Sequence, residues 1–183
     1  MEGDHGTENM GLAVFKDDKY VGDLSTIETL CYSLIKDEVD NFFVTLTNPF
    51  DENQKIDIYI DSLSEIDIDM DLSKENPVIN IKLNLSAKVL NMLNKPNLSY
   101  EETLNKLDDS LRQYLSKELL DYLYKTSKEY KADINEFYRI AKCKFLTNSD
   151  FDSYNWYEKY ENTQFNIAFN EDIISNVSGD EAF

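Results

Sequence analysis

Three aspartates occupy alternate positions in the stretch SEIDIDMDL, and carboxylates this close together could coordinate a cation. Asp67, Asp69 and Asp71 match the D-x-D-x-D opening of an EF-hand calcium loop. Counted from Asp67, that loop requires glycine at its sixth position, for a sharp turn, and glutamate at its twelfth, as a bidentate ligand. The chain has Leu72 and Val78 at these positions, so it lacks two features on which the loop depends.

The same aspartates also fit the solvated face of a β-strand. They alternate with Ile66, Ile68, Met70 and Leu72, which is the period of two expected when one face of a strand is buried. In an extended strand, carboxylates two residues apart are about 6.5–7 Å from one another, too far for three of them to close on one ion. We therefore predict a strand whose acidic face meets water or the basic surface of a partner. A weak cation contact is the alternative.

Histidine chemistry is missing from the part of the chain that we expect to fold. The only histidine, His5, lies in the polar segment 1–10, which we interpret as a disordered lead-in or a remnant of cloning. The predicted fold therefore has no Ser-His-Asp or Cys-His pair and no zinc site that contains histidine. Glycine-rich phosphate loops are absent too, since only Gly11, Gly22 and Gly179 lie outside that segment.

An enzyme built on this chain would have to use carboxylates, Lys or Tyr. A glycosidase, for example, needs two carboxyl groups about 5 or about 6.5–9.5 Å apart in a cleft. In a chain with 36 Asp and Glu residues such pairs are always available, and the sequence singles out none of them. We predict that the chain is not an enzyme and has no catalytic residues, no cofactor and no metal. A carboxylate-based hydrolase is the competing hypothesis.

The densest aromatic cluster is the segment YNWYEKY, which contains Tyr154, Trp156, Tyr157 and Tyr160. Trp and Tyr dominate the centres of protein–protein interfaces, so these side chains could form a partner-binding patch. They could instead cap the hydrophobic core beside the last strand, and we favour this second interpretation. Together with the acidic strand face, the cluster makes up the candidate partner surface.

The charge of the chain is −18, from 36 acidic and 18 basic residues. Nucleic acid and anionic membrane surfaces would repel such a field, so neither is expected as a partner. A basic protein surface or cations would suit it. No run reaches the roughly 18 consecutive apolar residues that span a bilayer.

The two cysteines, Cys31 and Cys143, are far apart in the sequence and have no metal-ligand spacing. Cys31 falls on the apolar stripe of a predicted helix, next to Leu34 and Ile35, and this favours a buried free thiol. A disulfide between the two cysteines is the alternative.

Strand and helix patterns alternate along the chain and define the elements that must position these residues. A hairpin is predicted at 11–22, and strands at about 42–47, 56–61, 66–72, 79–85 and 165–169. Three capping boxes, Ser25/Glu28, Ser99/Glu102 and Asp133/Glu136, predict helices that begin near Thr26, Tyr100 and Ile134. We predict the α+β class: an antiparallel sheet of about four to six strands with one face covered by helices, including a long helix at about 99–128. Residues 11–183 are expected to form one domain.

Three stretches of the chain are similar to a known family. They are GLAVFKDDKYVG followed by ETLCY, then EYKADINEFYRIAKCKF, and finally NWYEKYENTQFNIAFNEDI. In sequence and order they resemble the C-terminal domain of the spore germinant receptor C-subunit, in the Ger(x)C family of spore germination lipoproteins. The resemblance covers residues 11 to about 175, and its first stretch is the most specific.

The resemblance implies a non-catalytic role. Members of the family are anchored through an N-terminal lipid at the outer face of the spore inner membrane. There they assemble with two integral-membrane subunits into a complex that responds to nutrient germinants. This chain would be the C-terminal domain of such a larger lipoprotein, soluble by itself and reaching the membrane only through an anchor outside the chain. The alternative function is a small-ligand or cation-binding extracytoplasmic domain.

Overall fold

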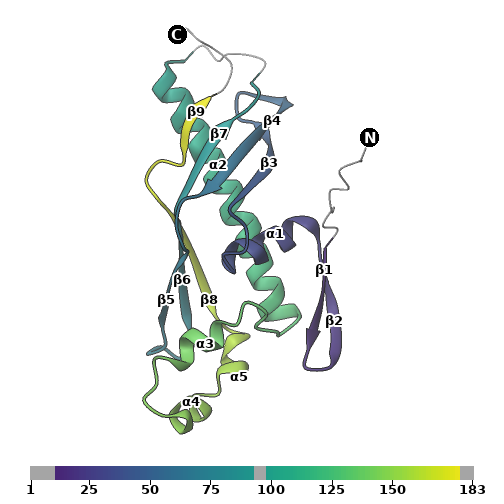
Figure 1. The fold of residues 1–183 in the computed structure, drawn as a ribbon, viewed down its shortest axis with the longest axis vertical. Coiled ribbons are helices and arrows are strands. Elements are labelled where there is room, and N and C mark those ends of the chain that lie inside the picture. The colour runs from purple at the N-terminus through teal and green to yellow at the C-terminus, as the bar shows by residue number, and fades with distance from the viewer. Residues whose placement is uncertain (1–10, 93–97, 178–183) are drawn as a thin grey trace, which may run out of the picture.

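The computed structural model describes residues 11–92 and 98–177 of the chain (Figure 1). The expected lead-in at 1–10, with His5, lies outside the described residues. None of the helices in the described ranges has both the length and the apolar composition needed to cross a membrane.

Nine strands in the described part of the chain form three sheets. A two-stranded sheet contains β1 (Leu12–Lys16) and β2 (Lys19–Leu24). A four-stranded sheet has the order β3 (Asn41–Asn48), β4 (Asp51–Ser62), β7 (Leu85–Val89) and β9 (Ile174–Val177). A three-stranded sheet has the order β5 (Asp67–Asp71), β6 (Val78–Leu83) and β8 (Gln164–Phe169).

The helices are α1 (Thr26–Ile35), α2 (Tyr100–Tyr124), the π-helix η1 (Lys125–Glu129), α3 (Phe137–Lys142), α4 (Asn148–Tyr154) and α5 (Trp156–Tyr160). The molecule is elongated, and α2 runs along both larger sheets (Figure 1). A helix of 25 residues is about 37 Å long, which is enough to cross both of them. The short helices α3, α4 and α5 gather at the end of the three-stranded sheet (Figure 1).

The two larger sheets are the halves of one interrupted sheet. β6 and β7 follow one another with only Asn84 between them, and β4 leads into β5 in the opposite direction. β8 pairs with β6, and β9 with β7, and both of these pairings are parallel. Strands β4, β7 and β9 of the four-stranded sheet are therefore in line with β5, β6 and β8 of the three-stranded sheet. All three strands are interrupted at the same level, and β3 has no counterpart in the three-stranded sheet.

An asparagine side chain bridges the interruption. The Leu85 amide donates to the side-chain oxygen of Asn170 at 2.8 Å, and the Asn170 side-chain amide donates to the Leu85 carbonyl at 3.0 Å. The backbone amide of Asn170 donates to the Leu83 carbonyl at 3.2 Å. Asn170 thus uses its side chain where a neighbouring strand would use a peptide group, and this satisfies backbone groups that the break leaves unpaired.

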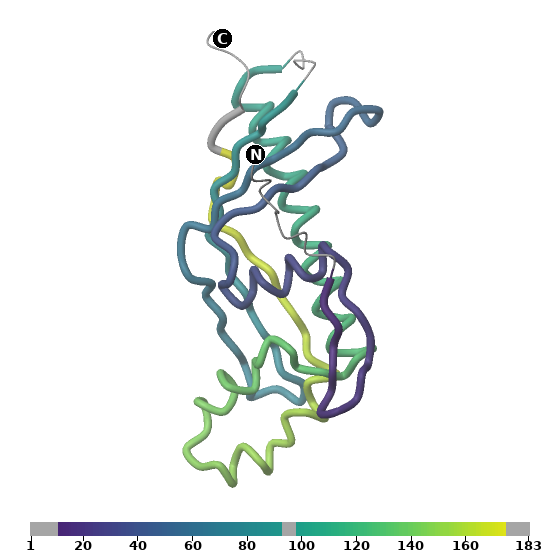
Figure 2. The backbone as a smooth tube through the Cα atoms, turned by 45° about the vertical axis from the view of Figure 1, so that its right-hand side comes forward, coloured from purple at the N-terminus to yellow at the C-terminus, as the bar shows by residue number. Residues whose placement is uncertain are grey.

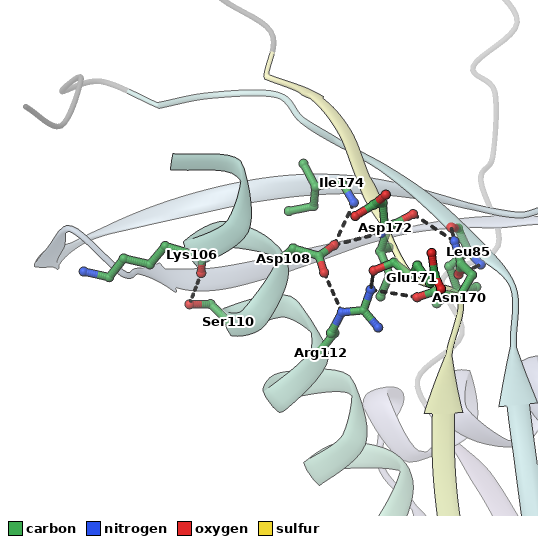
Figure 3. A network of polar contacts seen from close by, with 10 residues as sticks. Leu85, Lys106, Asp108, Ser110, Arg112, Asn170, Glu171, Asp172 and Ile174 are labelled. Carbon is green, nitrogen blue, oxygen red and sulfur yellow. Dashed lines mark hydrogen bonds and ion pairs between the residues drawn. The ribbon is translucent and has the colours of Figure 1, made fainter. Parts of the chain in front are cut away.

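Two residues of α2 hold the segment that crosses the interruption (Figure 3). The Asp108 carboxylate accepts hydrogen bonds from the amides of Ile173, at 2.8 Å, and Ile174, at 2.9 Å. Arg112, one turn further on, donates to the carbonyls of Asn170 and Glu171 and forms an ion pair with Asp108. The long helix is therefore bonded to the chain at the point where the strand ladder is broken.

The core lies between the helices and the inner faces of the sheets. α2 buries five leucines at intervals of four residues, which places them on one side of the helix. Alternate residues of the strands meet them from the sheets. These side chains are Leu107, Leu111, Leu115, Leu119 and Leu123 of α2, with Ile56, Ile58 and Ile60 of β4 and Ile79, Ile81 and Leu83 of β6.

The β1–β2 hairpin is attached to the C-terminal end of the long helix (Figure 2). Lys125 and Tyr130 both donate to the carbonyl of Asp23, at 3.0 and 2.7 Å. The π-turn bond from the Tyr130 amide to the Lys125 carbonyl brings these two residues onto one side of the helix. Gly22 allows the close approach, because a Cβ atom there would lie 2.5 Å from the Tyr130 ring.

The α+β class, the long helix and the first two capping boxes are confirmed. The single antiparallel sheet is not what the structure shows, because the strands divide over three sheets and include two parallel pairings. Parallel pairing requires a long crossover, and the helical segment between β7 and β8 provides it. The third capping box is wrong: Glu136 has a left-handed backbone (φ 60°) and the helix begins at Phe137.

Replacing Asp108 by Ala is expected to lower the free energy of unfolding by about 2–3 kcal/mol, because the amides of two buried residues lose their shared acceptor. Urea unfolding followed by circular dichroism measures this change. Asp109→Ala is the matched control, since Asp109 is an exposed aspartate on the same helix. A loss of stability for Asp108→Ala no greater than that for Asp109→Ala would show that the bonds across the interruption contribute nothing.

Candidate functional site

The acidic strand face lies on β5, at one edge of the three-stranded sheet. Asp67 and Asp69 are exposed, while Asp71 is half-buried. Asp69 forms an ion pair with Lys144 at 3.0 Å, and Asp71 accepts hydrogen bonds from the hydroxyl and amide of Ser73. The three carboxylates are therefore spread along an extended strand, and two of them meet different partners rather than converging on one point.

The electrostatics of this face favour ionised carboxylates. The hydrogen bond from Lys144 lowers the pKa of Asp69, and the hydrogen bonds from Ser73 lower the pKa of Asp71. Both groups are thus fully charged at neutral pH and are poor proton donors. In residues 11–92 and 98–177, no group of three or more His, Cys, Asp or Glu side chains is placed to hold a metal ion.

The aromatic cluster is divided between the core and the surface. Trp156 and Tyr160 are each 1% exposed, so they are core residues and cannot reach a partner. Tyr154 is half-buried, and Tyr157 is 57% exposed. Of the four aromatic residues considered from the sequence, only Tyr157 presents most of its ring to solvent.

A half-buried carboxylate, that of Asp133, orders this region. Asp133 accepts hydrogen bonds from the amides of Phe137, at 2.9 Å, and Tyr138, at 2.7 Å, and from the indole of Trp156, at 3.0 Å. Burial raises the pKa of Asp133, and the three hydrogen bonds act in the opposite direction. Because each bond joins Asp133 to an element of the helical end, we interpret it as the residue that fixes α3 and α5 together. Sequence patterns had placed it in a capping box with Glu136, which instead pairs with Lys36.

A cleft of about 470 Å³ lies between the tip of the β1–β2 hairpin, the turn before α3, and Tyr157. Phe15 and Tyr157 contribute aromatic surface, and the charges of Lys16 and Lys131 are matched by those of Asp17 and Asp133. Such a lining could receive a small ligand with an apolar part, and its balanced charge favours neither anions nor cations. No sequence pattern predicted this cleft, because the hairpin and the turn before α3 are more than a hundred residues apart along the chain.

Comparison with known proteins relates the chain to spore germination. A family model described as "Spore germination B3/GerAC like, C-terminal" matches residues 10–176. A solved structure, described as the crystal structure of the GerBC protein, is similar in fold, with a TM-score of 0.63 and 19% identity over 92% of this chain. The chain covers 50% of that protein's length. No curated protein sequence matches the chain.

The two cysteines differ in reactivity. Cys31 is 4% exposed, and burial, with the nearby Glu118 and Glu28, raises the pKa of its thiol to about 12. Cys143 is exposed, and both thiols are free. At pH 8 we expect a thiol reagent to label one cysteine in the native chain and two in denaturant, with Cys143→Ser leaving none in the native chain. Fewer than two thiols in denaturant without reductant would instead indicate the disulfide.

Calcium is not expected to bind the acidic strand face as a specific ligand, because its carboxylates are spread along an extended strand and two of them already have partners. Calorimetric titration with millimolar calcium should give no saturable heat, and the melting temperature should not change. Saturable binding with one ion per chain that disappears in Asp69→Asn would contradict this expectation.

Proposed function

The chain belongs to the spore germination B3/GerAC-like C-terminal family, and on that premise we propose that it is a non-catalytic domain of a nutrient germinant receptor C-subunit. In this proposal the domain acts in spore germination through contacts with other proteins of a membrane receptor complex. The observation that carries the proposal is the extent of the family match, which runs from residue 10 to residue 176 and includes nearly all of the described fold.

The structural roles of the partly buried carboxylates support a function in protein–protein contact rather than in catalysis. Asp108 and Asp133 each accept two or more hydrogen bonds that join separate elements of the fold. The Glu28 carboxylate binds Lys125 at 2.8 Å and caps α1. These partly or largely buried carboxylates stabilise structure, whereas exposed acidic residues such as Asp67 and Asp109 lie where a basic partner could reach them.

A position at the C-terminal end of a longer protein is part of the same proposal. The family description refers to a C-terminal region, and the chain spans half the length of the GerBC protein. The complete protein would carry a lipid anchor at its N-terminus and place this domain at the outer face of the spore inner membrane. Its partners there would be the integral-membrane subunits of the receptor.

The cleft beside Tyr157 favours a second candidate function, the binding of a small ligand by an extracytoplasmic domain. The cleft combines aromatic walls with two lysines and two aspartates, and Lys131 pairs with Glu161 at 2.8 Å. This function would complement a receptor role, since a ligand held there would contact both the hairpin and the helical end of the fold.

Removing this domain from the complete protein should abolish germination in response to nutrients, because the receptor would lose the contacts that the domain makes. The measurement is the loss of optical density in spore suspensions after addition of nutrient. A trigger that bypasses nutrient receptors serves as the control and should remain effective. Immunoblotting must show that the truncated protein still accumulates; a normal nutrient response from such spores would contradict the proposal.

A further inference from the structure

β3 is a long edge strand without a single charged residue. Its sequence is NFFVTLTN, in a chain of which 30% is charged. β3 pairs with β4 on one side, and in the part of the chain that the structure describes no strand pairs with it on the other (Figure 1). Natural edge strands are usually protected by charges, prolines or short length, because open backbone groups invite pairing with another chain.

The contrast with β5 shows that this fold does protect an edge elsewhere. β5, at the edge of the three-stranded sheet, carries three aspartates in five residues. β3 has none and exposes 63% of Phe43, whose ring rests on Tyr59 at a centroid distance of 5.1 Å. The β5 edge is therefore protected against strand addition, whereas the β3 edge has the features of a docking edge.

Two hollows lie along the side of β3 that faces the helices. The first, of about 480 Å³, lies between α1 and the beginning of the strand; its apolar lining includes Leu30, Val39 and Phe42, and Glu38 adds a negative charge. The second, of about 300 Å³, lies between α2 and the end of the strand; Leu46 and Tyr114 line it together with polar side chains and Lys117. Phe42 and Leu46 are four residues apart on one face, or about 13 Å along a strand. Side chains four residues apart on an added strand would meet both hollows.

The charged residues beside β3 determine which charge a docking segment should carry. The acidic residues Asp37, Glu38 and Asp40 precede β3, and Asp51 and Glu52 follow the turn at its end. They outnumber the lysines nearby, which are Lys36, paired with Glu136, Lys55, opposite Thr47, and Lys117, paired with Asp121. A second copy of the chain would pair in antiparallel fashion and bring the acidic end of one β3 against the acidic end of the other, within a pair of chains of charge −18 each. Repulsion therefore disfavours self-pairing, and it favours a segment that carries lysine or arginine at its ends.

We propose that β3 is a docking edge at which an extended, basic segment of another protein adds as a further strand. Backbone hydrogen bonds to β3 would provide affinity, and apolar side chains four residues apart would enter the two hollows and provide selectivity. The inference rests on the proposed function, in which the domain works through protein contacts, and it names the surface and the chemistry of the partner.

Thr45→Lys tests the docking edge with little disturbance of the fold. Thr45 is exposed, and its hydroxyl donates to Asp57 on β4 at 2.7 Å. A lysine there would replace this hydrogen bond with an ion pair to Asp57. Its charge would also protect the edge and repel a basic segment. Asn80→Lys is the matched control, because Asn80 is exposed and lies opposite Asp69 on the other sheet. Thr45→Val is the second variant; it removes the hydroxyl without adding charge.

Cross-linking in the complete protein, in spore membranes, provides the readout. With Phe43 replaced by the photo-reactive p-benzoylphenylalanine, we expect a cross-link to one segment of another protein. Mass spectrometry should show a segment with terminal lysines or arginines and apolar residues four apart. Thr45→Lys should reduce the yield by about tenfold or more, which is a loss of about 1.4 kcal/mol. Asn80→Lys and Thr45→Val should stay within about twofold of the parent.

Each other result overturns the inference. It fails if no cross-link forms, if the cross-linked segment comes from a second copy or is not basic, or if Thr45→Lys leaves the yield unchanged. If the yield falls for Thr45→Val as well as for Thr45→Lys, lost strand pairing with β4 explains the result and the docking edge is rejected. The proposed function survives any of these outcomes while removal of the domain still abolishes nutrient germination, so the two claims fail separately.

Discussion

The bonding between α2 and the chain at the interruption of the sheet is the interaction on which the rest of the fold depends. Where a sheet is broken, amides and carbonyls lose their ladder partners, and buried groups without partners cost about 1–3 kcal/mol each. Asn170 replaces part of the ladder with its side chain, while Asp108 and Arg112 of α2 bind the segment beyond it. The same helix supplies the leucine stripe of the core, so polar and apolar contacts fix it in one position.

This arrangement explains how the parts of an elongated molecule are held together. The two halves of the sheet share α2, and the hairpin and α1 are joined to its C-terminal end through Lys125. The helical end is joined to the same helix through the hydrogen bond between Tyr122 and Asn135. The hairpin, α1 and the segment before α3 are therefore tied to α2, and the exposed face of β3 remains available for contacts with other molecules.

Local signals in the sequence were enough to predict much of the fold. The capping boxes at Ser25 and Ser99 predicted where two helices begin, because a cap depends only on residues three positions apart. Alternation predicted the inner and outer residues of β5. The parallel pairings and the break at Asn84 could not be predicted, since they depend on bonds to Asp108, Arg112 and Asn170, which are distant in the chain. For the same reason, residue type alone could not decide that Trp156 is buried and Tyr157 exposed, or that β3 borders two hollows.

Hydrogen–deuterium exchange provides the most direct test of the proposal that the chain contacts a receptor complex through β3. The complete protein would be compared alone and within the isolated receptor complex. Amides in residues 41–48 are expected to become protected in the complex, while those of the acidic edge strand, residues 67–71, exchange at the same rate in both samples. Unchanged exchange in β3, with new protection at β5 or at the cleft beside Tyr157, would contradict it.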